Sequence, residues 1–312
     1  MPAAPHAPAL RYLALLGRAA ARVDAQLDTA IDAAALARHA AMSRHHFHRL
    51  FHAHFGMTVG GYLTWRRLQR ACEQLATTQA PVLDVALAVG FGSAQALAKA
   101  MRRELRLTPT QVRQGTAPDW AGWFAGQRIP EAPASPRDSQ AMLQPRWTTA
   151  PDLMALAASG RGMRDGHMAE AARQGFGTLI PALQDAGLMS QVTHCVALLT
   201  SEPRGPNDPA CEMLTGALFG HDLHAGRGAP AQPDLRLREG LRWWPLPGGR
   251  YAVFTHVGPY TGLHGLWTAI YRHWLPATGQ RLRDAPGFDL YIDDPRSTPP
   301  ERLRTALYLP VE

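Results

Sequence analysis

The chain has 312 residues, enough for about two domains, and 46% of them are hydrophobic, which suffices for packed cores. No uncharged apolar run reaches the length of about 18 residues that a spanning helix needs, so we expect no membrane segment. The three cysteines are scattered and form no CxxC pair, which argues against a disulfide-stapled fold and favours a reduced, cytoplasmic setting.

The formal net charge of +7 is concentrated in one part of the chain. Residues 1–115 hold 14 Lys and Arg against 6 Asp and Glu, whereas residues 116–312 hold 18 against 19. A basic surface confined to one half favours a polyanionic partner for that half. A surface that was basic only for solubility would spread its charge over both halves.

After a helix expected over residues 10–24, residues 31–56 have the pattern of two short helices joined by a tight corner. Asp32 and Ser43 suit the N-cap positions, because their side-chain oxygens can accept from the free amides of the first turn. The second helix has an apolar stripe made of Phe47, Leu50, Phe51 and Phe55. Its opposite stripe carries cations and donors, namely Arg44, His45, His48, Arg49 and His52. This pattern predicts a helix-turn-helix motif.

The same pattern occurs a second time. Residues 58–77 predict a long connecting helix, which leads to another pair of short helices over residues 82–112. Gly90 provides the corner, where the backbone is free to turn left-handed, and Ser93 caps the helix that follows. The outer face of that helix carries Gln95, Ala96, Lys99, Arg102 and Arg103. A further short helix is expected over residues 108–114.

Together these motifs resemble the DNA-binding domain of the AraC family of transcription regulators, and we assign residues 1–115 to it. The matching positions are Leu36-Ala37, Ser43, Phe47, Arg49, Phe51, Gly56, Tyr62, Arg66, Ala86, Gly90-Phe91, Ser93 and Pro109. Two positions depart from the family pattern: Ala41 replaces a glycine and Met101 a phenylalanine. The resemblance implies an all-α domain with two recognition helices that read successive major grooves of double-stranded DNA, and RNA polymerase as a further partner.

By this resemblance, both recognition helices offer side chains to bases or phosphates. The first offers His45, His48 and Arg49, and the second offers Gln95, Ala96 and Lys99. Arg can bind guanine and Gln can bind adenine through paired hydrogen bonds. Phosphate contacts, which set the register of binding, are assigned to Arg44, Arg66, Arg102 and Arg103. Any one of these side chains could instead be an ordinary exposed charge.

A metal site is the alternative for the histidine-rich helix. His48 and His52 are one turn apart, a spacing that suits a metal ion. No cysteine or carboxylate accompanies them within the helix, and the resemblance assigns the same face to DNA. We therefore predict no metal and no cofactor.

Residues 116–142 are rich in Pro, Ala, Gly and Ser, which predicts a linker. The aromatic residues Trp120, Trp123 and Phe124 are unusual for a free linker and favour docking on a domain surface. From residue 143 onwards, strands alternate with a helix in a pattern that occurs twice. Helices are expected near 168–186 and over 260–275, and strands near 145–158, 192–201, 212–220, 242–246, 249–257, 288–293 and 304–311. Two such units predict an α+β domain with an antiparallel sheet and two main helices.

Residues 143–312 resemble the GyrI-like small-molecule-binding domains. The likeness rests on Gly249-Arg250-Tyr251-Ala252, Phe254, His256, Gly258-Pro259-Tyr260, Trp274-Leu275-Pro276, Phe288-Asp289-Leu290-Tyr291 and Leu309-Pro310-Val311. The resemblance implies a cleft in which a glutamate helps to hold cationic or amphiphilic compounds, and Asp289 stands at that position. Strand alternation places Asp289 and Tyr291 on one face of the sheet. Cation–π walls could come from Trp244, Tyr260, Trp267 and Trp274, or these aromatics could be core.

We therefore expect a DNA-binding regulator, not an enzyme, whose second domain senses a small hydrophobic or cationic effector. Two alternatives stay open: the second domain is a hydrolase or scavenger, or it is an interaction module without a ligand. The common G-x-S-x-G, Walker and H-E-x-x-H motifs do not occur in the sequence.

Overall fold

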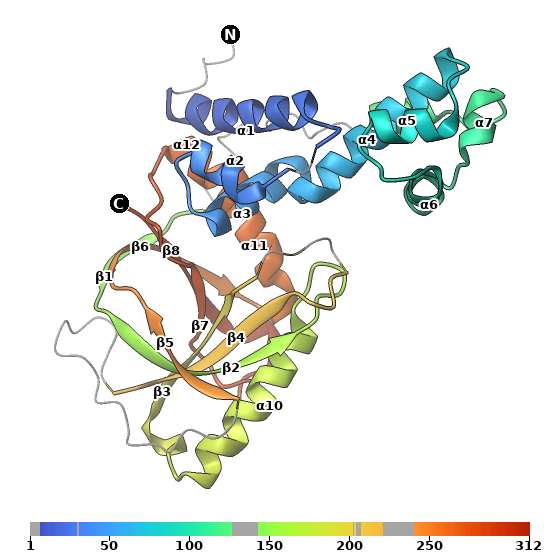
Figure 1. The fold of residues 1–312 in the computed structure, drawn as a ribbon. Coiled ribbons are helices and arrows are strands. Elements are labelled where there is room, and N and C mark those ends of the chain that lie inside the picture. The colour runs from blue at the N-terminus through green and yellow to red at the C-terminus, as the bar shows by residue number, and fades with distance from the viewer. Residues whose placement is uncertain (1–6, 30, 127–142, 202, 204–206, 221–239) are drawn as a thin grey trace.

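The computed structural model describes residues 7–29, 31–126, 143–201, 203, 207–220 and 240–312. Figure 1 shows an N-terminal group of helices and a C-terminal sheet domain that lie against each other. Within the described ranges, none of the helices combines the length and apolar character needed to cross a membrane.

The N-terminal part is helical throughout. Its elements are α1 (Ala7–Ala25), α2 (Ala33–His39), α3 (Arg44–Phe55), α4 (Val59–Thr77), α5 (Val82–Ala88), α6 (Ala94–Leu105), α7 (Pro109–Arg113) and α8 (Trp120–Gly126). The expected N-caps are formed: Asp32 accepts from the amide of Ala34 at 2.8 Å, and Ser93 accepts from the amide of Ala96 at 3.1 Å. Both predicted helix-turn-helix motifs, α2–α3 and α5–α6, are confirmed.

The corners of both helix-turn-helix motifs contain a residue with a left-handed backbone, but the residue differs. Gly90 turns between α5 and α6 with φ +86°, and a Cβ there would lie 2.4 Å from the carbonyl oxygen of Leu27. Ala41 turns between α2 and α3 with φ +51°. A left-handed backbone costs an L-residue with a Cβ roughly 1–2 kcal/mol. The alanine that replaces the family glycine is therefore strained.

The C-terminal part contains, among the described residues, one sheet of eight antiparallel strands. These are β1 (Arg146–Ala150), β2 (Leu153–Arg161), β3 (Val192–Leu199), β4 (Glu212–Phe219), β5 (Leu241–Leu246), β6 (Gly249–Val257), β7 (Phe288–Tyr291) and β8 (Arg304–Pro310). Their order is β1-β6-β8-β7-β3-β4-β2-β5. If β1, β2, β3 and β4 exchange places with β5, β6, β7 and β8, respectively, the order read from the opposite edge of the sheet is the same. The predicted duplication is confirmed, and the two units meet where β7 pairs with β3.

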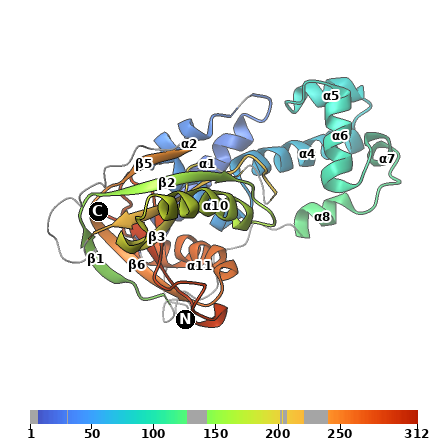
Figure 2. The ribbon, with the colours of Figure 1, turned by 90° about the horizontal axis from the view of Figure 1, so that it is seen from below.

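Each unit adds a helical segment to the sheet. In the first unit this is α10 (Ala169–Asp185), which packs on β2 and β4 (Figure 2). Gly175 lets α10 approach closely, because a Cβ there would lie 2.4 Å from the hydroxyl of Thr215. In the second unit, η2 (Tyr260–Gly262), α11 (Leu263–Ala269), the π-turn η3 (Ile270–Trp274) and α12 (Leu275–Thr278) follow one another directly. Short 3-10 turns, η1 (Met189–Gln191) and η4 (Pro300–Arg302), complete the domain.

The N-terminal helices belong to two hydrophobic cores, and the boundary between these cores lies within α4. The helices α1 to α3 and the beginning of α4 share one core with α11, η3, α12 and the strands β6 and β8; members include Leu16, Phe51, Ile270 and Leu307. The hydroxyl of Tyr12 also donates to the carbonyl of Gln280 at 2.5 Å. The later part of α4 forms a second core with α5 to α8. Figure 1 shows α5 to α7 at the far end of α4, away from the sheet. The first helix-turn-helix motif is thus joined to the sheet domain, and the second projects from it.

Part of the predicted linker is folded. Trp120–Gly126 forms the helix α8, and the buried Phe124 ring lies 5.7 Å from the ring of Trp65 on α4. The expected docking of this aromatic group is confirmed for Phe124. The rest of the predicted linker, residues 127–142, lies outside the described residues.

Candidate DNA-binding helices and effector cavity

The recognition helix α6 presents its polar face to solvent. Leu97, Ala100 and Met101 are buried in the second core. The five side chains assigned to DNA are all exposed: Gln95, Ala96, Lys99, Arg102 and Arg103. The face carries three basic side chains and the amide of Gln95, the groups that contact phosphates and base edges in a major groove.

The recognition helix α3 lies instead against the sheet domain, where it packs on α11 and η3. His48 is only 6% exposed. The guanidinium carbon of Arg49 lies 4.6 Å from the centroid of the Trp267 ring on α11. We expected this stripe to be open to solvent, and in this conformation it is not. Arg44 is exposed and His45 is half-buried. The DNA-binding roles of these side chains remain predictions.

His46, which the sequence pattern did not single out, ties α3 to the sheet domain. Its Nδ1 lies 2.8 Å from the hydroxyl of Tyr271, and its Nε2 lies 3.1 Å from the carbonyl oxygen of Arg283. Because a carbonyl can only accept, Nε2 carries the proton and Tyr271 donates to Nδ1. Burial, with a smaller effect of Arg49, lowers the pKa of His46 to about 4. The ring is therefore neutral at neutral pH.

His48 has a similar environment. Burial, followed by the neighbouring His52 and Arg49, lowers its pKa to about 4. The pKa of His52 is also lowered, first by burial and then by His264, whose ring centroid is 6.1 Å away. No group of three or more metal-binding side chains is found among the described residues. The polar stripe of α3 thus meets the sheet domain through neutral histidines around one arginine, while the apolar residues of α3 belong to the shared core.

Arg66, assigned to a phosphate, has partners inside the helical part. Its Nε donates to Asp24 at 2.6 Å, and its Nη1 donates to Gln69 at 2.7 Å. Asp24 belongs to α1, so this ion pair joins α1 to α4. The carboxylate offsets the charge that was expected to face DNA.

A cavity of ≈ 1400 Å³ lies between α3, α10, α11 and the centre of the sheet. Its walls include Tyr260, Trp267, Asp289 and Tyr291, four of the side chains expected near an effector, together with Phe176 of α10. The cavity lies beside the junction of β7 and β3, where the two units meet. One wall comes from α3 itself, through His48, Arg49 and His52.

Asp289 is the buried acid of this cavity. It is 8% exposed, and its Oδ1 accepts from the indole Nε1 of Trp267 at 2.8 Å. Burial raises the pKa of Asp289 to about 6, while Trp267, Arg49 and His256 act in the opposite direction. The carboxyl group is therefore mostly ionised at pH 7. A buried carboxylate among aromatic rings favours a cationic guest.

Two of the predicted aromatic contacts lie elsewhere, and that part of the prediction is wrong for this cavity. Trp274 is buried in the core shared with α3, with its ring 5.0 Å from Phe254. Trp244 lies on the edge strand β5, with the guanidinium of Arg242 5.2 Å from its ring. Helical spacing alone does not tell which of several aromatics on one helix reach a cavity.

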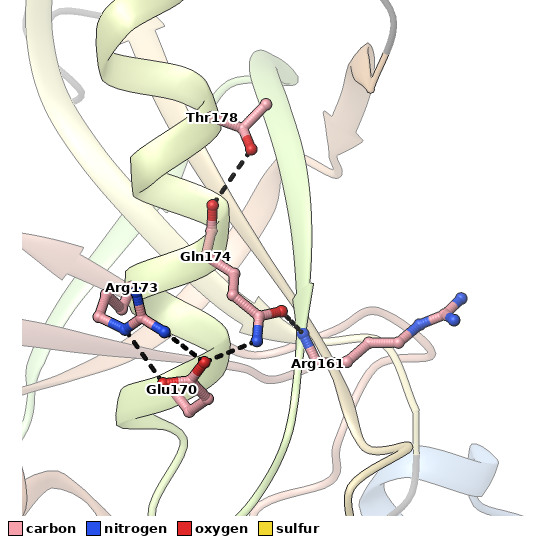
Figure 3. Close-up of polar contacts among 5 residues, drawn as sticks. All are labelled: Arg161, Glu170, Arg173, Gln174 and Thr178. Atoms are coloured by element: carbon pink, nitrogen blue, oxygen red, sulfur yellow. Dashed lines mark hydrogen bonds and ion pairs between the residues drawn. The ribbon is translucent and has the colours of Figure 1, made fainter.

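A polar network on α10 holds the first turns of that helix against β2 (Figure 3). Glu170 accepts from Arg173 at 3.0 Å and from the side-chain amide of Gln174 at 2.8 Å. The other end of the Gln174 amide accepts from the backbone amide of Arg161 at 3.1 Å. This anchoring fixes Phe176, whose ring lies 5.8 Å from that of Tyr291. The residues that carry the GyrI-like resemblance all lie in the second unit, so the sequence did not single out Phe176 of the first unit.

Two family models match the chain. Residues 36–115 match a helix-turn-helix domain, and residues 164–312 match the GyrI-like small molecule binding domain. The chain is 31% identical over 91 residues to the regulatory protein SoxS of Salmonella typhimurium, a match that covers 29% of this chain and 85% of SoxS. The chain belongs to the AraC-type family of transcription regulators. Its C-terminal part is a GyrI-like small-molecule-binding domain.

Other similar proteins match different shares of the chain. The probable transcriptional regulator YgiV of Escherichia coli K12 is 39% identical over 85 residues, which are 27% of this chain and 52% of YgiV. This chain thus spans about half the length of YgiV. A solved structure described as a hydrolase from Listeria innocua has 17% sequence identity and a TM-score of 0.37, and the match covers 56% of this chain and 98% of that chain. A likeness at this level does not bear on the activity of this AraC-type protein.

Proposed function

We propose that this AraC-type protein is a transcription regulator that responds to a hydrophobic cation. It binds the cation in the cavity beside Asp289 and binds DNA through α6 and α3. The observation that carries the proposal is the buried carboxyl group of Asp289, which accepts from Trp267 in a cavity lined by aromatic rings. A buried charge is costly without a partner, and a lipophilic cation supplies both the countercharge and apolar surface for Trp267, Tyr260 and Tyr291.

The DNA half of the proposal rests on charge and exposure. The open face of α6 bears Lys99, Arg102 and Arg103, and the match to a helix-turn-helix domain supports a role of this helix in the major groove. RNA polymerase is the further partner that such a regulator needs at a promoter.

The effector proposal is tested by titrating the full-length chain with tetraphenylphosphonium and following heat or tryptophan fluorescence. Triphenylphosphine oxide, a neutral compound with three of the same rings, is the matched ligand control. The Asp289→Asn variant keeps the shape of the side chain and removes its charge, so we expect its affinity for the cation to fall at least tenfold. Glu301→Gln, which removes an exposed acid outside the cavity, should bind like the parent.

The same titration separates the alternatives. Equal affinity for the cation and the neutral compound would contradict the charge argument. Hydrolysis of a lipophilic ester by the full-length chain would favour a hydrolase. Absence of binding by every compound would favour an interaction module.

A further inference from the structure

A positive side chain of the recognition helix already occupies the place that the proposed effector needs. Arg49 lies over the Trp267 ring at 4.6 Å, within the range of a cation–π contact. The indole of Trp267 in turn donates to Asp289 at 2.8 Å. Arg49 and Asp289 therefore contact the same indole ring: the guanidinium lies over its face, and the carboxylate accepts from the N–H at its edge.

Arg49 also acts electrostatically on the whole site. Its charge contributes to the lowered pKa values of His46, His48 and His264, and it opposes the raised pKa of Asp289. In the absence of a ligand, the guanidinium is thus a cation at one wall of a cavity whose acid is negative. Both the ring and the carboxylate would interact with an external lipophilic cation in the same way.

We infer that the effector and Arg49 compete for the face of Trp267, so that effector binding releases the DNA-reading face of α3. The inference rests on the proposed cationic effector. In the docked conformation only α6 offers an open recognition face, and the chain contacts one major groove. With the effector bound, α3 becomes available for the second groove.

The chemistry of the α3 contact suits an interface that opens. His46 exchanges its hydrogen bonds to Tyr271 and Arg283 for hydrogen bonds to water when it is exposed, and water can solvate the other three histidine rings, those of His48, His52 and His264, in the same way. Separating these polar groups costs less than separating apolar surfaces. The contact of α1 with α12 is apolar by comparison, with Leu16 and Leu275 in one core. Opening at α3 can therefore leave the helical part attached to the sheet domain.

The first test measures cation affinity without DNA, so the role of Arg49 in DNA binding does not interfere. We expect Arg49→Gln to raise the affinity for tetraphenylphosphonium about tenfold, the size of effect expected when a desolvated cation–π contact is lost. Arg49→Lys, which keeps a cation, should stay near the parent. Arg18→Gln is the matched control, because Arg18 is exposed on α1, does not line the cavity and has no assigned role in DNA binding.

The second test locks α3 in place. His52 and His264 face each other with ring centroids 6.1 Å apart, and neither is among the side chains assigned to individual bases or phosphates. The full-length double variant His52→Cys, His264→Cys is cross-linked with dibromobimane, and the His52→Cys variant treated in the same way is the control. We expect the cross-linked chain to protect one groove in a hydroxyl-radical footprint with or without tetraphenylphosphonium. The control should protect two grooves when the cation is present.

The outcomes distinguish the two proposals. If the parent binds the cation and Asp289→Asn does not, but Arg49→Gln binds no more tightly than the parent, competition is overturned and the effector proposal stands. An unchanged two-groove footprint after cross-linking also overturns it. If neither the parent nor Arg49→Gln binds the cation, both proposals fall.

Discussion

Replacing Tyr271 by phenylalanine should strengthen DNA binding, although Tyr271 lies in the sheet domain. The hydroxyl of Tyr271 donates to Nδ1 of His46 at 2.8 Å, and the substitution removes only this oxygen. His46 is 2% exposed, so its Nδ1 stays buried without a donor for as long as α3 is docked. The docked conformation loses stability, and the exposed DNA-binding side chains are unchanged.

The size of the effect follows from the cost of the unpaired acceptor. Leaving a buried hydrogen-bonding group unsatisfied costs about 1–3 kcal/mol. When a competent state is rarely populated, the apparent affinity scales with its population. The Tyr271→Phe chain should therefore bind a two-groove operator roughly 5- to 150-fold more tightly than the parent.

Fluorescence anisotropy on an operator selected from random sequences by the Tyr271→Phe chain measures this change. Tyr251→Phe is the matched control, because Tyr251 is an equally buried tyrosine whose hydroxyl donates to the carbonyl of Pro247 inside the sheet domain. It should lower stability without changing DNA affinity. Equal DNA affinities for the parent and Tyr271→Phe would refute the argument that docking of α3 opposes DNA binding.

Three further predictions concern stability and charge. Ala41→Gly should raise the free energy of unfolding in urea by about 1 kcal/mol, because glycine removes the strain of the left-handed alanine. Ala98→Gly inside α6 is the control and should lower this free energy by about 1 kcal/mol. A change of the same sign in both variants would contradict the strain at Ala41. Burial disfavours the protonated forms of His46 and His48, so their contribution to stability is complete above pH 6.5 and is lost as the pH falls toward 4. The free energy of unfolding in urea should then be lower at pH 5.5 than at pH 7.5 by about 1.4 kcal/mol for each histidine. Equal free energies at the two pH values would exclude the assigned burial. Lys99→Ala should weaken DNA binding at low salt and reduce the slope of log affinity against log salt by about 1; an unchanged slope would remove Lys99 from the phosphate contacts.

Local chemistry written in the sequence determined most of the secondary structure. Asp32 and Ser93 cap the helices that their positions predict, and Gly90 turns where only glycine fits. Period-two alternation placed Asp289 and Tyr291 on the cavity side of β7. These features depend on residues that are close in the chain, so spacing and residue type suffice to recognise them. The repeated pattern likewise predicted a sheet of two units, which pair with each other along β7 and β3.

Tertiary structure alone decided what covers each polar face. The stripes of α3 and α6 look alike in the sequence, yet Lys99 faces solvent and Arg49 faces Trp267. Hydrophobic periodicity shows which side of a helix packs in an apolar core, but a face buried through histidines and a cation–π contact has no apolar signature. The sequence pattern likewise does not show that Arg66 pairs with Asp24 of α1, because the two residues are 42 positions apart. Trp274 packs on Phe254 in the shared core, which is the alternative that the sequence left open. Whether a recognition helix is open or covered depends on such distant partners, and only the folded chain brings them together.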